Sequence, residues 1–325
     1  MAQWLRAGLA VAFLVLGAGW GQAQDYPNRL ITIVVPGSPG GIPDILARLV
    51  QARLEKLWNQ RIVVDNKQGA NTQIATVAVA KAAPDGYTLL VTPKETFAVN
   101  PVLYRNLGYD PVNDFEPITG LAKVRHALVV NKDLPVQTVK DLIELARKKP
   151  GELNYGTFGV GSSSHLNTEM FGIMAGIKLT PVHYRGQGPA LTDVVAGHIQ
   201  MLFLSARNAT EPWKGGHVKL LGVGSPARMS ALPEIPTMAE SSGLSGYEAE
   251  SSFGLFAPRG TPPEIIAKIN AAVQGIFNDP SFRAAVLDPQ YLESMVSAPV
   301  DFKKYLASEA DKAARIVREA NIKVE

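Results

Sequence analysis

The chain contains no cysteine in its 325 residues. This excludes a disulfide framework, a thiolate nucleophile, thiolate-bound zinc and a lipid anchor on cysteine. The fold must therefore be stable through its apolar core alone. A chain of this length exceeds the size at which one core usually keeps growing, so we expect two domains.

A strong excess of one charge is also lacking. The sequence has 32 basic and 29 acidic residues and a formal net charge of +3. Such a balance gives no electrostatic basis for binding nucleic acid or an anionic membrane surface. We expect no nucleic-acid partner.

Long apolar runs are absent after the first residues. The run from Ala7 to Leu16 follows the single basic residue Arg6 and leads into small residues up to Ala23. It is shorter than the roughly 20 residues of a membrane-spanning helix, although a single-pass anchor is the alternative. The pattern predicts a signal peptide cleaved near Ala23, and hence export to the periplasm.

Motifs of known enzyme classes are missing as well. The sequence has no Gly-x-Ser-x-Gly, no Gly-x-x-x-x-Gly-Lys and no Gly-x-Gly-x-x-Gly motif, and its five histidines show no metal-ligand spacing. No pair of carboxylates can be assigned as acid and base. We therefore expect neither an enzyme nor a bound metal or cofactor.

What the chain does contain is an alternation of strands, glycine-rich turns and helices. Arg29 to Val35 is a β-rich run that breaks at Pro36 to Gly41 before a helical pattern, and a comparable unit begins at Ala127. This alternation predicts an α/β fold with a mostly parallel sheet covered by helices on both faces. The last strand, Phe253 to Ala257, and two C-terminal helices are expected to return to the first half.

The chain would then cross between two lobes twice, near residues 122–126 and 246–252, which permits hinge closure. The predicted division is a signal peptide at 1–23, a first lobe at 24–124 and 250–325, and a second lobe at 125–249. Helix starts with capping boxes are predicted at Thr138, with Asp141, and at Thr261, with Glu264.

Two glycine loops, Pro36 to Asp44 and Thr157 to His165, each follow a strand and open a helix. Each directs unpaired N–H groups and a positive dipole end toward the space above the sheet. Either loop alone could be a plain strand-to-helix turn, but corresponding positions in two half-chains favour a shared anion site. The hydroxyl groups of Ser38 and Ser162 to Ser164 could add further hydrogen bonds.

Two titratable residues of these loops have alternative interpretations. Asp44 can stabilise the helix N-terminus, or it can orient the loop or bind an ammonium or hydroxyl group of a ligand. His165 can donate to a carboxylate or have a structural role.

Motifs in one order along nearly the whole mature chain indicate a family. They include Tyr26-Pro27, Pro36 with Gly40-Gly41 and Asp44, Val64-Asp65-Asn66, Ala83 to Leu89, Asn100-Pro101, Tyr109-Asp110-Pro111, Gly159 to His165, Tyr184-Arg185-Gly186, Ala190 to Asp193, Leu232 to Thr237, and Ala257-Pro258. In these the chain resembles the Bug, or TctC-like, receptors of tripartite tricarboxylate transporters.

The resemblance implies a fold of the periplasmic-binding-protein type, with two Rossmann-like lobes around a ligand cleft and two interlobe crossovers. It implies a monomeric receptor that captures a small carboxylate (a di- or tricarboxylate, an amino acid or an aromatic carboxylate) for the membrane subunits of a transporter or for a sensor. A periplasmic hydrolase or isomerase using His165 with Asp44 or Asp193 is the alternative. The implied ligand-binding residues are Ser38, Pro39, Gly40, Gly41, Asp44, Thr92, Thr157, Gly159, Gly161, Ser162, Ser163, His165 and Asp193, the last of which could instead support its loop.

The sequence departs from the family pattern at Gly37, Pro43, Asn71 to Gln73, His183 and Phe253. A missing large side chain at 37 could widen the cleft, and Pro43 removes a hydroxyl and an N–H donor. These departures predict a ligand that is bulkier or partly apolar, such as an aromatic carboxylate.

Overall fold

The computed structural model describes residues 26–323. The predicted signal peptide and its cleavage site lie outside these residues. Among the described residues, no helix has both the length and the apolar character needed to cross a membrane.

The first lobe is built on three parallel strands. β1 (Ile31–Val35) lies between β2 (Ile62–Asn66) and β3 (Thr88–Pro93). These strands form where apolar, mostly β-branched residues occur in short runs, and β1 is buried on both faces. Between them lie α2 (Ile42–Trp58) and α3 (Gln73–Ala80), and β3 is followed by the short helices α4 (Glu95–Ala98) and α5 (Asn100–Leu103).

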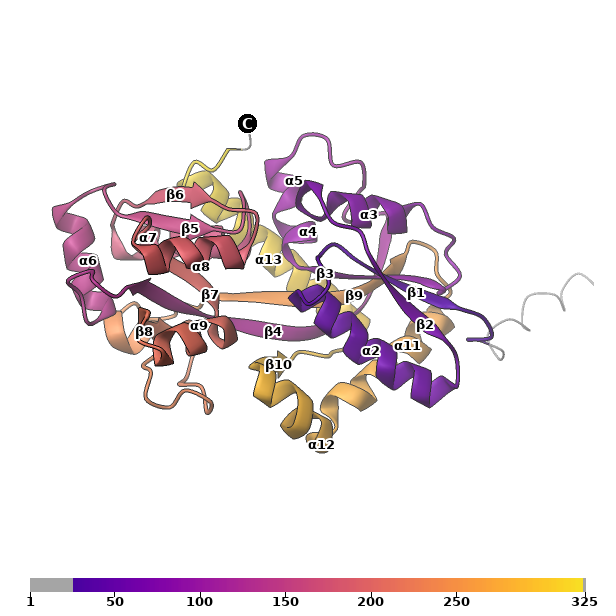
Figure 1. The fold of residues 1–325 in the computed structure, drawn as a ribbon. Coiled ribbons are helices and arrows are strands. Elements are labelled where there is room, and N and C mark those ends of the chain that lie inside the picture. Colours follow the sequence, from indigo (N-terminus) through magenta and orange to yellow (C-terminus); the bar gives the residue numbers. More distant parts are fainter. Residues whose placement is uncertain (1–25, 324–325) are drawn as a thin grey trace, which may run out of the picture.

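One long strand joins the two lobes. β4 (Phe115–Asn131) pairs antiparallel with β9 (Glu250–Pro258) along its first part, from Phe115 to Arg125. Its second part pairs with β7 (Met201–Ser205) and β8 (Val218–Val223). β4 and β9 therefore form the connection on which the lobes could rotate (Figure 1).

The second lobe repeats the parallel arrangement with β5 (Asn154–Thr157), which lies between β6 (Thr180–His183) and β7. Its helices are α6 (Val139–Lys148), α7 (Ser163–Ala175), α8 (Gln187–Ala196), α9 (Ala206–Lys214) and α10 (Met238–Ser242). The predicted α/β fold with two lobes is thus confirmed. The expectation of a mostly parallel sheet is wrong, because β4, β8, β9 and the short β10 (Leu292–Ser294) all pair antiparallel.

Apolar clusters cover both faces of the sheet in each lobe. In the first lobe α2 and α11 (Pro263–Asn278) pack on one face, and α3 and α13 (Pro299–Glu319) pack on the other. In the second lobe α6, α7 and α10 cover one face, and α8 and α9 cover the other. Each lobe therefore has its own core.

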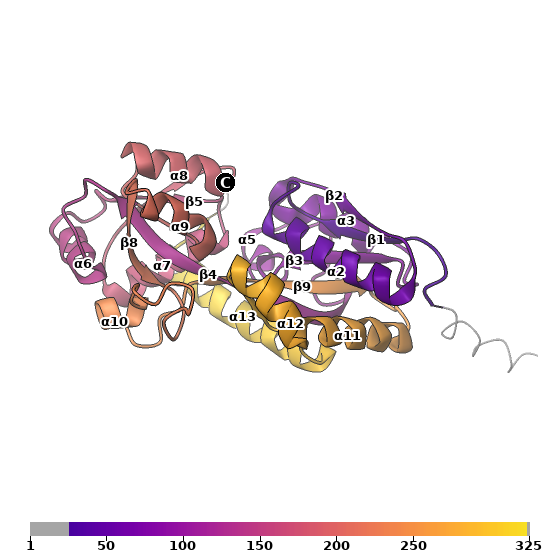
Figure 2. The same cartoon turned by 60° about the horizontal axis from the view of Figure 1, so that its bottom comes forward.

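The C-terminal elements return to the first lobe only in part. β9 pairs with β3, and α11 packs against α2. The last helix, α13, contacts α4 of the first lobe and α7 of the second, so it spans the junction (Figure 2). The lobe boundaries at 124/125 and 249/250 fall near the end of the β4–β9 ladder and remain a prediction.

Candidate functional site

Strand direction places two sets of loops opposite each other. β4 runs from the first lobe into the second, and β9, antiparallel to it, runs back. β3 is antiparallel to β9 and parallel to β1, so both end toward the second lobe. By the same reasoning β5, β6 and β7 end toward the first lobe. The loops after β1 and β5 therefore face each other across the junction, at the carboxyl ends of strands where α/β proteins bind ligands.

The first glycine loop is fixed by Asp44. The buried Asp44 carboxylate accepts hydrogen bonds from the Gly40 amide at 2.9 Å, from Asn66 Nδ2 at 3.1 Å and from Arg48 Nε at 2.9 Å. Burial acts to raise the pKa of Asp44, but the bonds from Arg48, Gly40 and Asn66 outweigh it and hold the pKa below its ordinary value. Asp44 is therefore an ionised residue that orients its loop.

The second loop is fixed by His165. Its Nδ1 accepts a hydrogen bond from the Gly161 amide at 3.1 Å, and its ring is 4% exposed and lies against the ring of His183. Burial, and then the neighbouring His183, lower the pKa of His165 to about 4. The imidazole is neutral at pH 7, with its proton on Nε2. Donation from His165 to a ligand remains a prediction.

Both helix starts leave backbone donors for a ligand. The first three N–H groups of an α-helix have no acceptor within the helix. In α7 these belong to Ser163, Ser164 and His165. In α2 only Ile42 and Asp44 supply them, because Pro43 has no N–H.

The loop serines are mostly engaged within their own loops. Ser38 Oγ donates to Gln68 Oε1 at 3.0 Å, and Ser162 Oγ donates to the Gly159 carbonyl at 2.7 Å. Ser164 Oγ accepts from the Phe158 amide at 2.9 Å. These bonds shape the loops, and contact of these hydroxyl groups with a ligand stays a prediction.

Two other predicted residues, Thr92 and Thr157, have partners inside the protein. Thr92 is fully buried and lies 2.7 Å from Thr96, hydroxyl to hydroxyl. Thr157 Oγ1 lies 2.7 Å from His183 Nδ1 and accepts from the Gly159 amide at 3.1 Å. These three contacts engage both threonine hydroxyl groups within the protein.

Asp193 lies in α8, where it accepts a hydrogen bond from the Tyr184 hydroxyl at 2.7 Å. Its other oxygen is 3.3 Å from His198 Nδ1. This favours the supporting role for Asp193, and its contact with a ligand stays a prediction. Among the described residues, no cluster of three or more His, Asp and Glu side chains could hold a metal.

A cavity of about 650 Å³ lies between the lobes and is lined by residues that sequence reasoning missed. The second lobe contributes Gln187, Arg207 and Asn208, from the starts of α8 and α9, and the other lobe contributes Tyr291. Gln187 Oε1 accepts from Asn208 Nδ2 at 3.1 Å, which ties the two helix starts together. The signal in the sequence was the apolar run Met201 to Leu204, followed by Ser205 as a helix N-cap.

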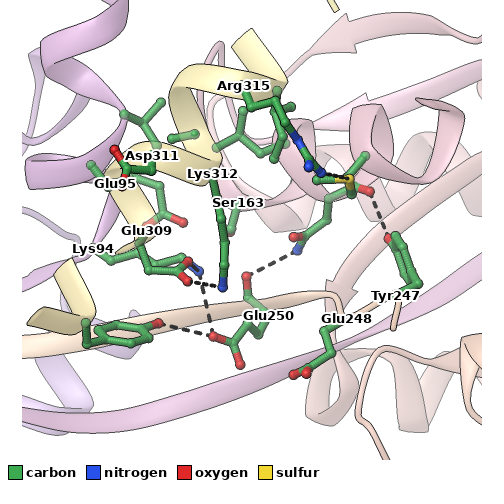
Figure 3. Close-up of a pocket in the computed structure, with 18 of the residues that line it drawn as sticks. Lys94, Glu95, Ser163, Tyr247, Glu248, Glu250, Glu309, Asp311, Lys312 and Arg315 are labelled. Atoms are coloured by element: carbon green, nitrogen blue, oxygen red, sulfur yellow. Dashed lines mark hydrogen bonds and ion pairs between the residues drawn. The ribbon is translucent and has the colours of Figure 1, made fainter. Parts of the chain in front are cut away.

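A second cavity, of about 620 Å³, lies beside α13 and shares only Ser163 with the predicted site (Figure 3). Of the predicted residues, Ser163 alone lines either of these two cavities.

Comparison with known proteins agrees with this architecture. The sequence profile described as the tripartite tricarboxylate transporter family receptor matches residues 46–322. Protein BugT of Bordetella pertussis is 32% identical over 307 residues, which cover 93% of this chain and 92% of BugT.

Solved structures are similar over the same range. An R. palustris protein solved with adipate is 37% identical, with a TM-score of 0.84 over 92% of this chain and 99% of that protein. MatC from Rhodopseudomonas palustris, solved with bound malate, is 32% identical, with a TM-score of 0.77 over 90% of this chain and 100% of MatC. The resemblance found in the sequence motifs is confirmed, and the chain belongs to the tripartite tricarboxylate transporter receptor family.

Proposed function

We propose that this chain is a solute-binding receptor that captures a small carboxylate between its lobes. The observation that carries the proposal is the pair of glycine loops at facing strand ends, each with its glycine amide held by a side chain four residues later. Rigid loops with free helix amides bind an anion without a matching cation. Closure of the lobes on the β4–β9 connection would enclose the ligand.

The ligand's carboxylate binds chiefly at the start of α7. That end offers three amides, from Ser163, Ser164 and His165, and His165 adds no charge there. The start of α2 offers fewer amides, and the ionised Asp44 already interacts with its dipole. The first loop therefore contacts the rest of the ligand or a second carboxylate.

Two kinds of observation bear on the class of ligand: the ligands bound by relatives, and the positions at which this sequence departs from the family pattern. Relatives solved with adipate and with malate support an aliphatic dicarboxylate. Against this, Gly37 and Pro43 are neighbours: a Cβ at 37 would lie 3.6 Å from the Pro43 ring. Two departures from the family pattern thus change one wall of the site, which keeps aromatic carboxylates among the ligands to be tested.

The remaining assignments follow from the family. The receptor acts in the periplasm as a monomer and delivers its ligand to the membrane subunits of a tripartite transporter, or presents it to a sensor. It performs no turnover, because the neutral His165 and the ion-paired Asp44 are both used to hold loops. Incubation with each bound carboxylate, followed by mass spectrometry, should return the ligand unchanged; a product that disappears in His165→Ala would favour the hydrolase or isomerase.

Thermal unfolding tests the binding proposal. The panel is adipate, malate, glutamate and benzoate, with hexane-1,6-diol as an uncharged control for adipate. Ligand at 100 times its Kd stabilises the fold by about 2.7 kcal/mol, which raises the Tm by several degrees. A rise with one carboxylate class and none with the diol is expected. The proposal fails if no carboxylate raises the Tm and native mass spectrometry finds no ligand already bound.

A further inference from the structure

The cavity beside α13 lies on the other side of the junction from the starts of α2 and α8. In the first lobe α13 packs on the face of the sheet opposite α2, and in the second lobe α7 packs on the face opposite α8. Figure 2 shows β4 and β9 between α8 and α13. The cavity is enclosed by α4, α7, α13 and the first residues of β9. Its volume of about 620 Å³ is within the range of small-molecule sites.

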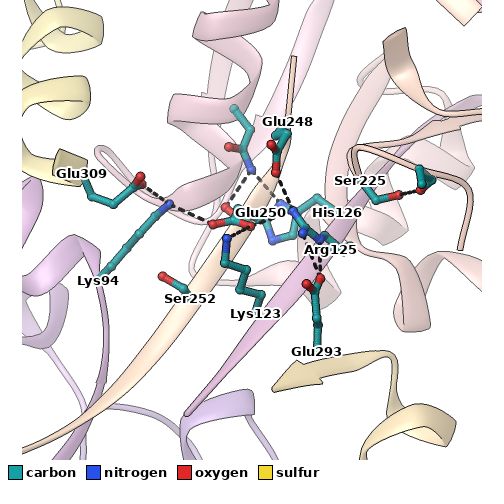
Figure 4. A network of polar contacts seen from close by, with 12 residues as sticks. Lys94, Lys123, Arg125, His126, Ser225, Glu248, Glu250, Ser252, Glu293 and Glu309 are labelled. Carbon is teal, nitrogen blue, oxygen red and sulfur yellow. Dashed lines mark hydrogen bonds and ion pairs between the residues drawn. The ribbon is translucent and has the colours of Figure 1, made fainter. Parts of the chain in front are cut away.

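The cations of its polar wall are largely neutralised by ion pairs. Lys94 Nζ lies 2.5 Å from Glu309 Oε2 and 3.7 Å from Glu250 Oε1. Lys123 pairs with Glu250 at 3.3 Å, and Lys312 pairs with Glu309 at 2.7 Å. Figure 4 shows this network converging on Glu250. These lysines are therefore poor partners for an incoming anion.

Two acids of the same wall have no ion pair among the described residues. Glu95 lines the cavity and is 6% exposed, and its Oε1 has no hydrogen-bond partner in the part of the chain described. Burial raises the pKa of Glu95 to about 7, against the opposing effect of Lys94. Asp311 lines the same cavity from the exposed side of α13, and Figure 3 shows it toward the same end as Glu95, away from Arg315. A buried carboxylate without a partner is costly, so this end favours a positively charged group.

The rest of the lining is mixed: Glu248, Arg315 and Asn167 belong to it, and so does an apolar stretch. Val99, Leu166, Met170 and Ile316 lie in one hydrophobic cluster, and Met174 also lines the cavity. Methionine side chains adapt to aliphatic groups of varied shape. The cavity thus combines an acidic end with an apolar wall.

We propose that this cavity is a second ligand site, which binds a small organic cation: a primary ammonium group at Glu95 and a short aliphatic body against Met170 and Ile316. It meets the proposed carboxylate site only at Ser163, the first residue of α7. The ammonium group pairs with the Glu95 carboxyl group, and Asp311 adds attraction at the mouth.

Isothermal titration of the protein with n-hexylammonium chloride tests this site, with n-hexanol and sodium chloride as controls for the aliphatic chain and for the salt. We expect saturable binding of n-hexylammonium alone. Glu95→Gln should weaken it at least tenfold, and Asp311→Asn about threefold. The matched control Asp301→Asn, exposed on the same helix and outside the cavity, should bind normally.

Two further measurements separate loss of binding from loss of folding. Glu95→Gln should bind adipate with the affinity of the parent protein. Met174→Lys changes a side chain that is 37% exposed and puts a cation at the apolar wall, so it should abolish n-hexylammonium binding without unfolding. The proposal would be overturned if the parent protein does not bind n-hexylammonium. It would also be overturned if Glu95→Gln and Met174→Lys both bind n-hexylammonium with the affinity of the parent protein.

Discussion

The first glycine loop, Pro36 to Asp44, and the second, Thr157 to His165, are closed by the same contact. In each, the third residue of the following helix accepts a hydrogen bond from the amide of a glycine four residues earlier. The accepting groups differ, because Asp44 is ionised and paired with Arg48, while His165 is neutral and buried. One architecture thus gives two helix starts held by the same contact, of which the first carries a negative charge and the second carries none.

The largest expected difference between the loops is in the stability lost when Gly40 or Gly161 is replaced by alanine, because the two glycines are packed differently. Gly40 and Gly161 have φ of 81° and 75°, where an alanine costs about 1 to 2 kcal/mol. A Cβ at 40 meets nothing within 4 Å, whereas one at 161 would overlap Leu103 and lie 3.2 Å from Val99 Cγ1. Overpacking adds about 1 to 3 kcal/mol. Urea unfolding should therefore show a larger loss of stability for Gly161→Ala than for Gly40→Ala.

Leu103→Ala provides the matched background for that comparison. It removes the side chain that a Cβ at 161 would overlap, so the added cost of Gly161→Ala should shrink toward that of Gly40→Ala. An equal loss for both glycines in the parent protein would show that the second loop is not packed against α5.

Acid should weaken the second loop before the first. The pKa of His165 is about 4 in the folded protein and about 6.5 in the unfolded chain, so the unfolded state takes up its proton first. The stability contributed by neutral His165 is therefore full above pH 6.5 and is lost as pH falls toward 4. Asp44 also has a lowered pKa, and its contribution is lost only below its ordinary value of 3.8.

Protonation of His165 should lower the free energy of unfolding by about 3 kcal/mol between pH 6.5 and pH 4. It can be measured as the difference in pH dependence of stability between the parent protein and His165→Gln, since the buried His126 and the exposed His183 are present in both. Parallel curves between pH 6.5 and 4 would mean that His165 is not held neutral.

Removing the charge of Asp44 should produce the smallest effect. Asp44→Asn keeps an acceptor for the Gly40 amide and removes a negative charge from the start of α2, where such charges are worth about 0.3 to 1 kcal/mol. Adipate should bind about two- to fivefold more tightly by calorimetry, while the half-exposed control Asp65→Asn should bind adipate as the parent protein does. A tenfold loss would instead show that Asp44 contacts the ligand directly.

The sequence was sufficient for the elements that depend on local pattern. The strands and the glycine turns at Pro36 and Phe158 follow from runs of apolar residues and from residues that permit tight turns. The capping box of Thr138 and Asp141 forms as expected, since all its partners lie within four residues.

Features set by distant contacts could not be predicted. Thr261 does not cap its helix, because its hydroxyl donates to the Pro258 carbonyl at 2.8 Å and α11 begins one residue later, after Pro262. The packing of α13 on both α4 and α7 depends on the lobes being adjacent, which no periodicity reveals. Arg207 was missed because β7 passes into α9 without the glycine turn that follows β1 and β5.

The most direct test of the anion site removes one backbone donor from the start of α7. Ser163 is the first residue of that helix, where proline is well tolerated, and the preceding Ser162 is already extended as proline requires. Ser163→Pro deletes the amide donor and the hydroxyl, and Ser163→Ala deletes the hydroxyl alone. With a hydrogen bond to a charged group worth about 1.5 to 3 kcal/mol, the proline variant should bind adipate roughly 10- to 100-fold more weakly than the alanine variant, at unchanged stability. Equal affinity of the two variants would contradict the claim that the amides of the second loop hold the carboxylate.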